Sequence, residues 1–454
     1  MSRPSPGRGR PRTRPGLFLA AAAFCFGACD SATDVTVPRI ESVETLSAAA
    51  LVQPLRIVLD RVAPLAVEYW TDDGPRLRAH SPAARVHDVA LARLRPGRQY
   101  RYEIGGEAGR GSFTSGSLPD DLARITLRAN GTPTVPLVLL HLFDPAGFRG
   151  YAITDAAGEI VWYWRTVDFP FGASRRANGN FVFMDKGRGL VEVTLAGDVV
   201  HELPQDLAQR ELHHDAITTP RNTVLFIAFD ERTVDDRRVR GEAIWEWTPE
   251  TGEARERWSS WDHFSLASDR GPRFGLEWMH ANALSFGARG NVLLSVHYFN
   301  QILSLSPDFT TIEWRLGGIN ATATVPGEAF SGQHTPTEIA PDRVLLFDNG
   351  IERGGPSRAV ELEIVGDVAH QRWEWFAPNA NFSTAVSSAR RLPNGHTLVG
   401  FGMSEGLNGS SGPTEVYEIT ADGTPVWHLE VAGTTVMFRA EPLAAVATET
   451  VVHR

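Results

Sequence analysis

Histidines recur beside the apolar runs of a repeated pattern, and histidine is the side chain best suited to chemistry near neutral pH. Three of them each come shortly before a strand that begins a new unit: His214, His280 and His334. A neutral imidazole acts as a nucleophile or general base, whereas a protonated one binds anionic oxygens or donates a proton. Equivalent positions in a closed ring of β-sheets converge on the mouth of its channel. We therefore expect these three side chains to be neighbours.

Other histidines at loop or strand-edge positions are His213, His263 and His297. Several imidazoles at one mouth are also compatible with a metal, since imidazole suits zinc, copper or iron. The chain has no His-x-x-x-His pair and no cysteine spacing typical of a preformed metal site. We therefore predict a site that holds neither a metal nor another cofactor.

The units that must position these histidines are short apolar or alternating runs, each followed by an aromatic strand. Six such runs occur: Tyr151–Asp155, Asn178–Phe183, Arg221–Phe226, Gly290–Ser295, Asp342–Phe347 and Asn394–Val399. Trp258, Trp314, Trp373 and Trp427 recur at a spacing of roughly 55 residues, close to the length of a four-stranded propeller blade. The pattern predicts an all-β fold with a six-bladed β-propeller over residues 119–454. The alternative is a stack of two sandwiches, which the regular repeat disfavours.

Residues 38–118 read as a separate small β-domain of short strands and turn signals. Its Leu94–Ile104 stretch, with the pattern Leu-x-Pro-Gly-x-x-Tyr-x-Tyr, precedes a final strand at Gly111–Thr114. This arrangement resembles fibronectin-III-like β-sandwiches, in which a tyrosine at a turn hydrogen-bonds to nearby backbone. We expect this domain to support or space the larger one.

Residues 1–29 have the features of a targeting segment. A cluster of arginines precedes the apolar run Leu17–Phe26, which is too short to cross a bilayer as a folded helix. The run ends in Phe26-Gly27-Ala28-Cys29, which resembles the cleavage box of bacterial lipoproteins. We predict that Cys29 is lipidated, that residues 30–37 are a tether, and that the protein is exported and lipid-anchored at the cell envelope. An ordinary secretory signal is the alternative.

The composition excludes one large class of function. The chain of 454 residues has a formal net charge of -10. General nucleic-acid binding requires a basic surface that neutralises phosphates, so we predict no nucleic-acid partner. Cys25 and Cys29 are the only cysteines. Cleavage before Cys29 would leave a single, lipidated cysteine, and no internal disulfide.

Short motifs follow one another along residues 137–445 in an order that resembles the bacterial arylsulfotransferase (aryl-sulfate sulfotransferase) family. Each motif alone is weak, but their shared order on a six-unit repeat is specific. In chain order they are His-His-Asp at His213, Trp-x-His-x-Asn at Trp278, Leu-Leu-Ser at Leu293, Gln-His at Gln333, Leu-Phe-Asp-Asn-Gly at Leu346, Ser357-Arg358-Ala359-Val360-Glu361, and Leu-Pro-Asn-Gly at Leu392. From the residues alone, Asp348-Asn349-Gly350 reads as a tight turn whose glycine supplies a positive φ.

The resemblance implies sulfuryl transfer from an aryl sulfate donor to a phenol acceptor, without a nucleotide sulfate. It implies a covalent sulfohistidine, and the matching nucleophile is His334. His214 and His280 match two further active-site histidines, and Asn282 a nearby asparagine. We expect protonated His214 and His280 to bind the equatorial sulfuryl oxygens, and one of them to exchange protons with the phenols.

The resemblance departs at one position. The family carries an arginine two residues after the serine of Leu-Leu-Ser, and His297 stands there. His297 or Arg358 is then the candidate sulfate-binding group, and Trp278 the candidate for stacking on an aryl ring. The His297 replacement favours a second hypothesis, a non-catalytic surface propeller that binds a ligand or a protein. A metal-dependent hydrolase or lyase on the same scaffold is a third.

Overall fold

Strands, turns and loops make up nearly all of the described part of the chain, as its 42 glycines and 29 prolines predict. The computed structural model describes residues 38–47, 51–105, 109–271, 275–327, 329–447 and 449–452. The helical segments among them are all short: α1 (Asp120–Ala123), α2 (Gln205–Ala208), η1 (Ser260–Asp262), η2 (His297–Phe299) and η3 (Leu407–Gly409). None of these described helices has the length and apolar character needed to span a membrane. The predicted targeting segment, Cys29 and the tether lie outside the described residues.

The N-terminal strands form one sheet, in which β1 pairs with β2 and the other strands follow the order β31-β3-β2-β4-β5. Its strands are β1 (Ile40–Thr45), β2 (Gln53–Trp70), β3 (Leu77–Leu91), β4 (Gln99–Ile104), β5 (Gly109–Thr114) and β31 (Thr450–Val451). The first half of β2 pairs with β1 and its second half with β4, while β3 runs along both halves. The register shifts around Ala63, next to Pro64, which has no N–H to donate to the ladder. The end of the chain thus returns to the N-terminal sheet, through β31.

The remaining described strands form six sheets, five of them four-stranded and one five-stranded. In order along the chain, the first three contain β30 (Val436–Leu443), β7 (Leu137–Phe143), β8 (Arg149–Asp155) and β9 (Ile160–Arg165); β10 (Pro170–Arg175), β11 (Phe181–Asp185), β12 (Gly189–Val193) and β13 (Val199–Glu202); and β14 (Leu212–Thr218), β15 (Val224–Val234), β16 (Arg237–Trp247) and β17 (Ala254–Ser259). The last three contain β18 (Ala281–Phe286), β19 (Val292–Val296), β20 (Gln301–Leu305) and β21 (Ile312–Leu316); β22 (His334–Ala340), β23 (Arg343–Asp348), β24 (Arg358–Val365) and β25 (Val368–Phe376); and β26 (Ser388–Arg391), β27 (Thr397–Phe401), β28 (Thr414–Ile419), β29 (Pro425–Val431) and β6 (Leu127–Gly131).

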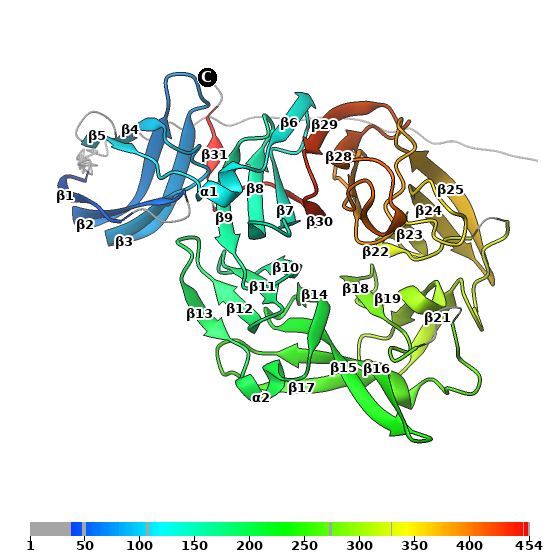
Figure 1. Ribbon diagram of the computed structural model, residues 1–454. Coiled ribbons are helices and arrows are strands. Elements are labelled where there is room, and N and C mark those ends of the chain that lie inside the picture. The colour runs from blue at the N-terminus through cyan, green and yellow to red at the C-terminus, as the bar shows by residue number, and fades with distance from the viewer. Residues whose placement is uncertain are drawn as a thin grey trace, which may run out of the picture. The chain divides into compact units, whose positions relative to one another are not determined.

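The first strand of each sheet contacts the first strand of the next, in the series β10, β14, β18, β22, β26 and β30. Figure 1 shows the sheets following one another in this order around a common centre. The two ends of this region interlock, because C-terminal β30 is the first strand of the β7–β9 sheet and N-terminal β6 is the last strand of the β26–β29 sheet. These first strands are called the inner strands below.

The repeat recognised in the sequence does not begin at the inner strands. Five of its six apolar runs overlap the second strand of a sheet, among them β15, β19 and β23. β19 and β23 are buried along most or all of their length, and β15 at its first five residues, so these stretches read as apolar runs. The inner strands carry polar residues and irregular register, so they show no clear period of two. The histidines expected in loops before a strand lie at the beginnings of these unrecognised strands.

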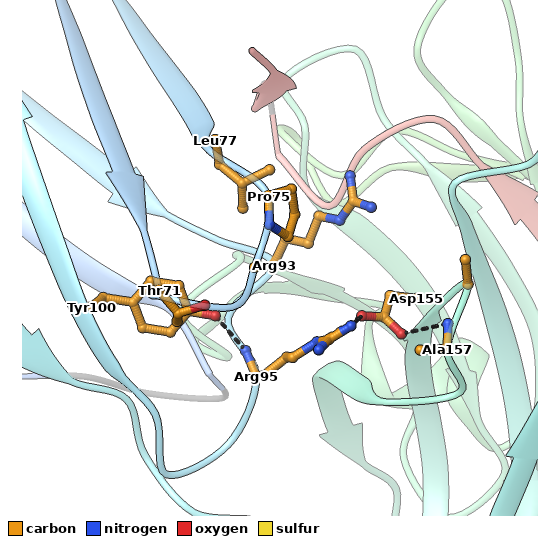
Figure 2. Close-up of a pocket in the computed structure, with 10 residues that line it drawn as sticks. Thr71, Pro75, Leu77, Arg93, Arg95, Tyr100, Asp155 and Ala157 are labelled. Atoms are coloured by element: carbon orange, nitrogen blue, oxygen red, sulfur yellow. Dashed lines mark hydrogen bonds and ion pairs between the residues drawn. The ribbon is translucent and has the colours of Figure 1, made fainter. Parts of the chain in front are cut away.

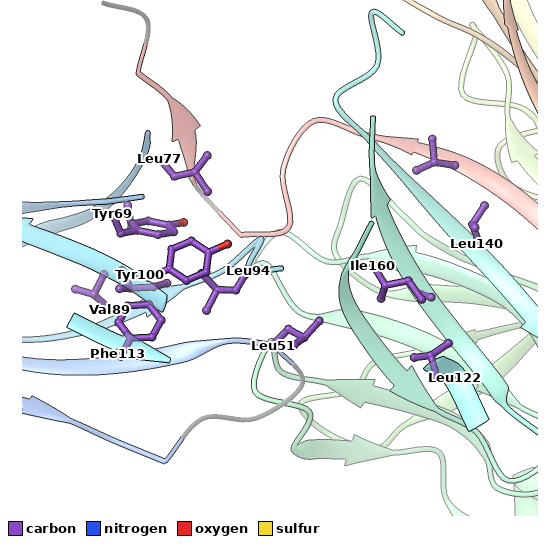
Figure 3. Close-up of a cluster of buried hydrophobic side chains, with 14 of the residues drawn as sticks. Leu51, Tyr69, Leu77, Val89, Leu94, Tyr100, Phe113, Leu122, Leu140 and Ile160 are labelled. Carbon is purple, nitrogen blue, oxygen red and sulfur yellow. The ribbon is translucent and has the colours of Figure 1, made fainter. Parts of the chain in front are cut away.

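One hydrophobic cluster joins the N-terminal sheet to the β7–β9 sheet. It includes Tyr69, Leu94 and Tyr100 on one side, and Leu140 and Ile160 on the other (Figure 3). At the edge of this cluster lies a pocket of about 230 Å³ that is lined by Arg95 and Asp155, among other residues (Figure 2). These two side chains form an ion pair with 2.7 Å between Nη2 and Oδ2. The backbone N–H of Arg95 also donates to the hydroxyl of Tyr100 at 2.9 Å.

Candidate active site

Three inner strands begin with an irregular backbone, and each irregularity falls at a histidine. His214 lies within β14, His280 directly precedes β18, and His334 is the first residue of β22. The strand register shifts across His214, directly after His334, and between Ala281 and Ala283 just after His280, as in β-bulges, which re-aim side chains and are frequent beside active sites. His214 has φ +58°, His280 has φ +53°, and Thr335, next to His334, has φ +47°. Positive φ at non-glycine residues costs energy and clusters at functional sites.

These strands bring the expected histidines together in a row of five imidazole rings. The ring centroids are 5.0 Å apart for His213 and His214, 4.7 Å for His214 and His280, 5.2 Å for His280 and His297, and 5.5 Å for His297 and His334. His214, His280 and His297 are partly exposed, so the row is open to solvent. His263 lies elsewhere, stacked on Trp258.

His334 sits at one end of the row and is buried. Its Nδ1 is 2.7 Å from Oδ1 of Asn349 and 3.1 Å from the carbonyl oxygen of Gly332. The amide group of Asn349 donates to the carbonyl of Ser383 at 2.7 Å, so its oxygen faces the histidine. Both partners of Nδ1 are acceptors, so Nδ1 carries the proton and Nε2 holds the lone pair. Burial and the nearby cation of Arg439 lower the pKa of His334 to about 3, so the ring is neutral at pH 7.

His280 occupies the centre of the row. Its Nδ1 contacts the carboxylate of Glu277, and this hydrogen bond lowers the pKa of Glu277. The ring stacks on Tyr298 at 4.7 Å between centroids. Nδ1 is therefore engaged and the ring plane is set by two contacts, which leaves Nε2 as the nitrogen for a ligand.

His214 lies beside His280 and has a different environment. Its Nδ1 is 2.8 Å from Nδ1 of His213, and its ring packs on Phe171. Burial and the surrounding imidazoles lower the pKa of His214 well below its ordinary value. From the sequence we expect a protonated His214, but burial of the ring and the charges of the neighbouring imidazoles favour the neutral form instead.

Asn282 holds backbone in place. Its Nδ2 donates to the carbonyl of Gln333 at 2.8 Å, directly before His334. The backbone carbonyl of Asn282 accepts from Arg439 at 3.0 Å, and Arg439 also pairs with Asp215 at 2.7 Å. Both Arg439 and Asp215 are buried, so this ion pair ties β14, β18 and β30 together beneath the row.

The two remaining predicted contacts lie outside the row. Trp278 is 0% exposed; its indole N–H donates to the carbonyl of Asp269, and its ring packs against Trp261. It has no face open to a ligand, because the core of the β14–β21 region covers it. The guanidinium of Arg358 is held by Asp348 and Glu374 of its own sheet, at 2.8 and 2.7 Å. Neither side chain is placed to contact a molecule bound at the histidines.

Among the described residues, no group of three or more His, Cys, Asp or Glu side chains has an arrangement that would hold a metal ion. The imidazole rings cross at steep angles, at 72° for His214 and His280 and at 73° for His297 and His334. In His214, His280 and His334 it is Nδ1 that a neighbouring side chain engages.

Several residues around the row were not singled out by sequence reasoning. Asn349 lies in a motif that was noted but read only as a tight turn, and Gly350 does have the expected positive φ of +71°. Glu277 and Tyr298 are direct neighbours of noted histidines and could have been flagged for that reason. Glu242 and Arg439 carry no local signal, since they come from other strands and meet the site only through the fold.

Residues 136–439 match the family model described as arylsulfotransferase (ASST). A search of curated proteins finds no match. Among solved structures, a protein of unknown function from Bacteroides caccae is 14% identical, with a TM-score of 0.45, over 69% of this chain and 100% of that chain. Virginiamycin B lyase from Staphylococcus aureus is 12% identical, with a TM-score of 0.36, over 81% and 100%. A putative 6-phosphogluconolactonase from Bacteroides uniformis is 12% identical, with a TM-score of 0.39, over 83% and 99%.

Proposed function

Because this chain belongs to the arylsulfotransferase family, we propose that it transfers a sulfuryl group from an aryl sulfate to a phenol through a covalent intermediate on His334. The observation that carries the proposal is the state of His334. It is neutral, its Nδ1–H is engaged by Asn349, and Nε2 is the remaining nucleophile. Its neighbours in the row are groups that bind anionic oxygens or exchange protons.

In the first half-reaction, Nε2 of His334 forms a bond to sulfur while the bond from sulfur to the aryl oxygen breaks. The departing phenolate takes a proton from the site. The ring keeps its Nδ1 proton, so the sulfurylated imidazole is cationic, and Oδ1 of Asn349 stabilises the charge on that N–H. A cationic imidazole is a good leaving group, which favours the second half-reaction.

In the second half-reaction, a phenol oxygen attacks sulfur and the electron pair of the S–N bond returns to Nε2 of His334. The phenol gives up its proton to the site. His214 and His280 are the acid–base groups of the row, and they replace the proton that the first phenolate removed. Over one cycle a proton leaves with the first phenol and a proton arrives with the second, so the number of protons in the site is unchanged.

His297 takes the place of the family arginine and is the group nearest His334 in the row. We assign it to the sulfuryl oxygens. A protonated imidazole offers one N–H in that direction, whereas a guanidinium offers a two-pronged fork. This difference favours the second candidate function, a propeller that binds a ligand without reacting with it. Arg358 is not a substitute, since Asp348 and Glu374 hold it.

The finer architecture is also a proposal. The series of contacts from β10 to β30, together with the contacts of β10 with β7 and β8 of the β30 sheet, supports a six-bladed β-propeller closed by β30 and β6. The pairing in the N-terminal sheet supports a fibronectin-III-like sandwich in which β2 and β3 each run through two strands of the usual pattern. The bond from Arg95 N–H to the hydroxyl of Tyr100, five residues later, supports a tyrosine corner.

Export and lipid anchoring are proposed on the sequence of residues 1–29, which end at Cys29. A lipidated Cys29 would hold the enzyme at the cell envelope, where aryl sulfates and phenols arrive from outside. Expression of Cys29→Ala in a bacterial host tests this: the wild-type chain should partition with membranes and the variant with the soluble envelope fraction. The same distribution for both would contradict anchoring.

Intact-protein mass spectrometry tests the proposed reaction. The soluble chain is incubated briefly with 4-nitrophenyl sulfate, and an adduct of about 80 Da is expected, the mass of one sulfuryl group. His334→Ala should abolish the adduct, while the control His263→Ala should keep it, because His263 lies outside the row. No adduct and no release of nitrophenol with phenol present, from pH 5 to 9, would favour the binding propeller.

A further inference from the structure

A carboxylate lies beneath the histidine row without touching a ligand position. Glu242 of β16 is 0% exposed. Its Oε1 accepts from the backbone N–H of Ala281 at 2.9 Å, and its Oε2 is 2.9 Å from Nε2 of His213. Burying a carboxylate is costly unless its oxygens are paired, and nitrogens of Ala281 and His213 face the two oxygens of Glu242.

The contacts of Glu242 determine which ring nitrogens of His213 and His214 carry a proton. Nε2 of His213 and Oε2 of Glu242 lie at ion-pair distance without the alignment of a hydrogen bond, and a ring nitrogen that faces a carboxylate is the one that carries the proton. With a single proton on Nε2, the ring of His213 has its lone pair on Nδ1. Because Nδ1 of His214 is 2.8 Å from it, His214 is the donor in this pair. His214 is left with its lone pair on Nε2, so it is a base toward a bound molecule.

The second acid–base histidine has no such chain behind it. His280 meets the carboxylate of Glu277 directly through Nδ1. This carboxylate faces the positive charge of the ring when Nε2 also holds a proton, so His280 is able to act as an acid. His214 and His280, with ring centroids 4.7 Å apart, are thus linked to carboxylates in different ways, one through His213 and one directly. Pairs of titratable groups in different surroundings are typical of divided acid and base roles.

We propose that Glu242, His213 and His214 form a relay that makes His214 the base for the acceptor phenol, while His280, with Glu277, is the acid for the departing phenolate. This inference rests on the proposed sulfuryl transfer. His214 is the catalytic residue of the relay, since it meets the substrate. His213 and Glu242 are positioning residues that act through it.

The relay operates in the second half-reaction. The phenol O–H bond breaks and its proton passes to Nε2 of His214, as the phenol oxygen bonds to sulfur and the S–N bond to His334 breaks. His214 becomes cationic and its Nδ1–H donates to His213, whose Nε2–H faces the charge of Glu242. His214 and His280 are both partly exposed, so the first loses its proton to water and the second regains one before the next donor binds.

The packing around the relay explains why it stays fixed. His213 is buried and stacks on Phe229 with 3.9 Å between ring centroids. Glu242 is anchored at its backbone as well, where its N–H donates to the hydroxyl of Ser260 at 2.9 Å. Neither group has room to turn toward the solvent, so each acts only through its neighbour.

Glu242→Gln is the test, because it keeps an oxygen for the N–H of Ala281 and removes the charge. Release of nitrophenol from 4-nitrophenyl sulfate in a single turnover measures the first half-reaction. Nitrophenolate is a weak base and needs little protonation. Decay of the adduct of about 80 Da after adding a phenol measures the second half-reaction, which needs a base because an ordinary phenol has a pKa near 10.

We expect Glu242→Gln to slow the second half-reaction on the order of 10²-fold, at least tenfold more than the first, and more strongly for less acidic phenols. Glu415→Gln is the matched control: it removes the same charge from a buried glutamate that pairs with partly exposed His428 at 3.0 Å, outside the row. It should leave both half-reactions within a factor of about two, the expectation for a remote pair. If Glu242→Gln does not fold, His213→Gln serves, since an amide can bond to Glu242 but cannot hold a second proton.

The outcomes separate the two proposals. Equal losses in both half-reactions, or losses independent of phenol acidity, overturn the relay and leave sulfuryl transfer standing. Absence of any adduct in the wild-type protein overturns the sulfuryl transfer and the relay with it. A selective loss that the control does not show supports both.

Discussion

Nδ1 of His334 lies 2.7 Å from Oδ1 of Asn349, and the amide group of Asn349 is itself turned by its bond to Ser383. Asn349 therefore holds the proton of His334 on Nδ1 without stabilising a charged ring. A carboxylate at the same place would stabilise the imidazolium and remove the lone pair that Nε2 needs in the resting enzyme. A neutral acceptor serves both states of the cycle, the free ring and the sulfurylated one.

Asn349→Asp should make sulfurylation sensitive to acid. The new carboxylate raises the pKa of His334 from about 3 toward its ordinary value, so part of the protein carries a protonated, unreactive ring at pH 5. A pKa about one unit above pH 5 leaves about a tenth of the rings neutral at pH 5, so the ratio of single-turnover rates at pH 8 and pH 5 should rise about tenfold over the wild-type ratio. Identical pH profiles for the two proteins would remove Asn349 from this role.

The free energy of unfolding should decrease as the pH is lowered, starting at a pH above the range in which carboxylates titrate. Burial lowers the pKa of His334 and His141 to about 3, whereas the unfolded chain takes these protons near pH 6.5. Above pH 6.5 both states are neutral at these rings. Between pH 6.5 and about 3 the unfolded state binds more protons than the folded state. Each ring therefore lowers the free energy of unfolding by about 1.4 kcal/mol for every unit by which the pH is lowered.

Thermal unfolding between pH 7 and pH 5 measures this effect. His141 lies outside the histidine row and its Nδ1 contacts the carbonyl of Phe171. His141→Gln should therefore reduce the dependence of stability on pH by the contribution of one ring. A melting temperature that does not change between pH 7 and pH 5 in the wild-type protein would contradict the assignment.

Loss of the buried pair of Arg439 and Asp215 should be costly when only one partner is removed. Arg439→Met leaves a buried carboxylate without its cation, and we expect a loss of about 3–5 kcal/mol in the free energy of unfolding. Adding Asp215→Asn should recover part of the loss. Denaturant unfolding of the single and double variants measures this coupling.

The exposed pair of Arg289 and Asp342, also 2.7 Å apart, is the matched control. Arg289→Met should cost less than about 1 kcal/mol, because solvent screens the pair. Similar losses in the free energy of unfolding at the two pairs would show that the buried pair stabilises the fold no more than the exposed one does.

Restoring the family arginine should strengthen sulfate binding. In His297→Arg, a permanent cation with a planar fork replaces an imidazole, and the KM for an aryl sulfate at pH 8 should fall about tenfold, or about 1.4 kcal/mol. His370→Arg adds the same charge at an exposed position on β25 and should leave KM unchanged. An unchanged KM in both variants would place His297 away from the sulfuryl oxygens.

The sequence by itself determined the all-β character of the chain, its propeller-like repeat, its family and the histidines that meet. Buried strands such as β19 and β23 can be recognised as apolar runs in the sequence, because residues covered on both faces of a sheet must be apolar. The order of the motifs at His214, His280 and His334 was enough to identify the family, since those residue types recur with the repeat.

Only the tertiary structure decided what surrounds each histidine. The inner strands escaped recognition because bulges break their periodicity and polar side chains line the centre. Glu242 and Arg439 reach the site from β16 and β30, at separations in the chain that no local pattern encodes. Protonation depends on those neighbours and on burial, so the neutral state of His214 and the burial of Trp278 required three-dimensional positions.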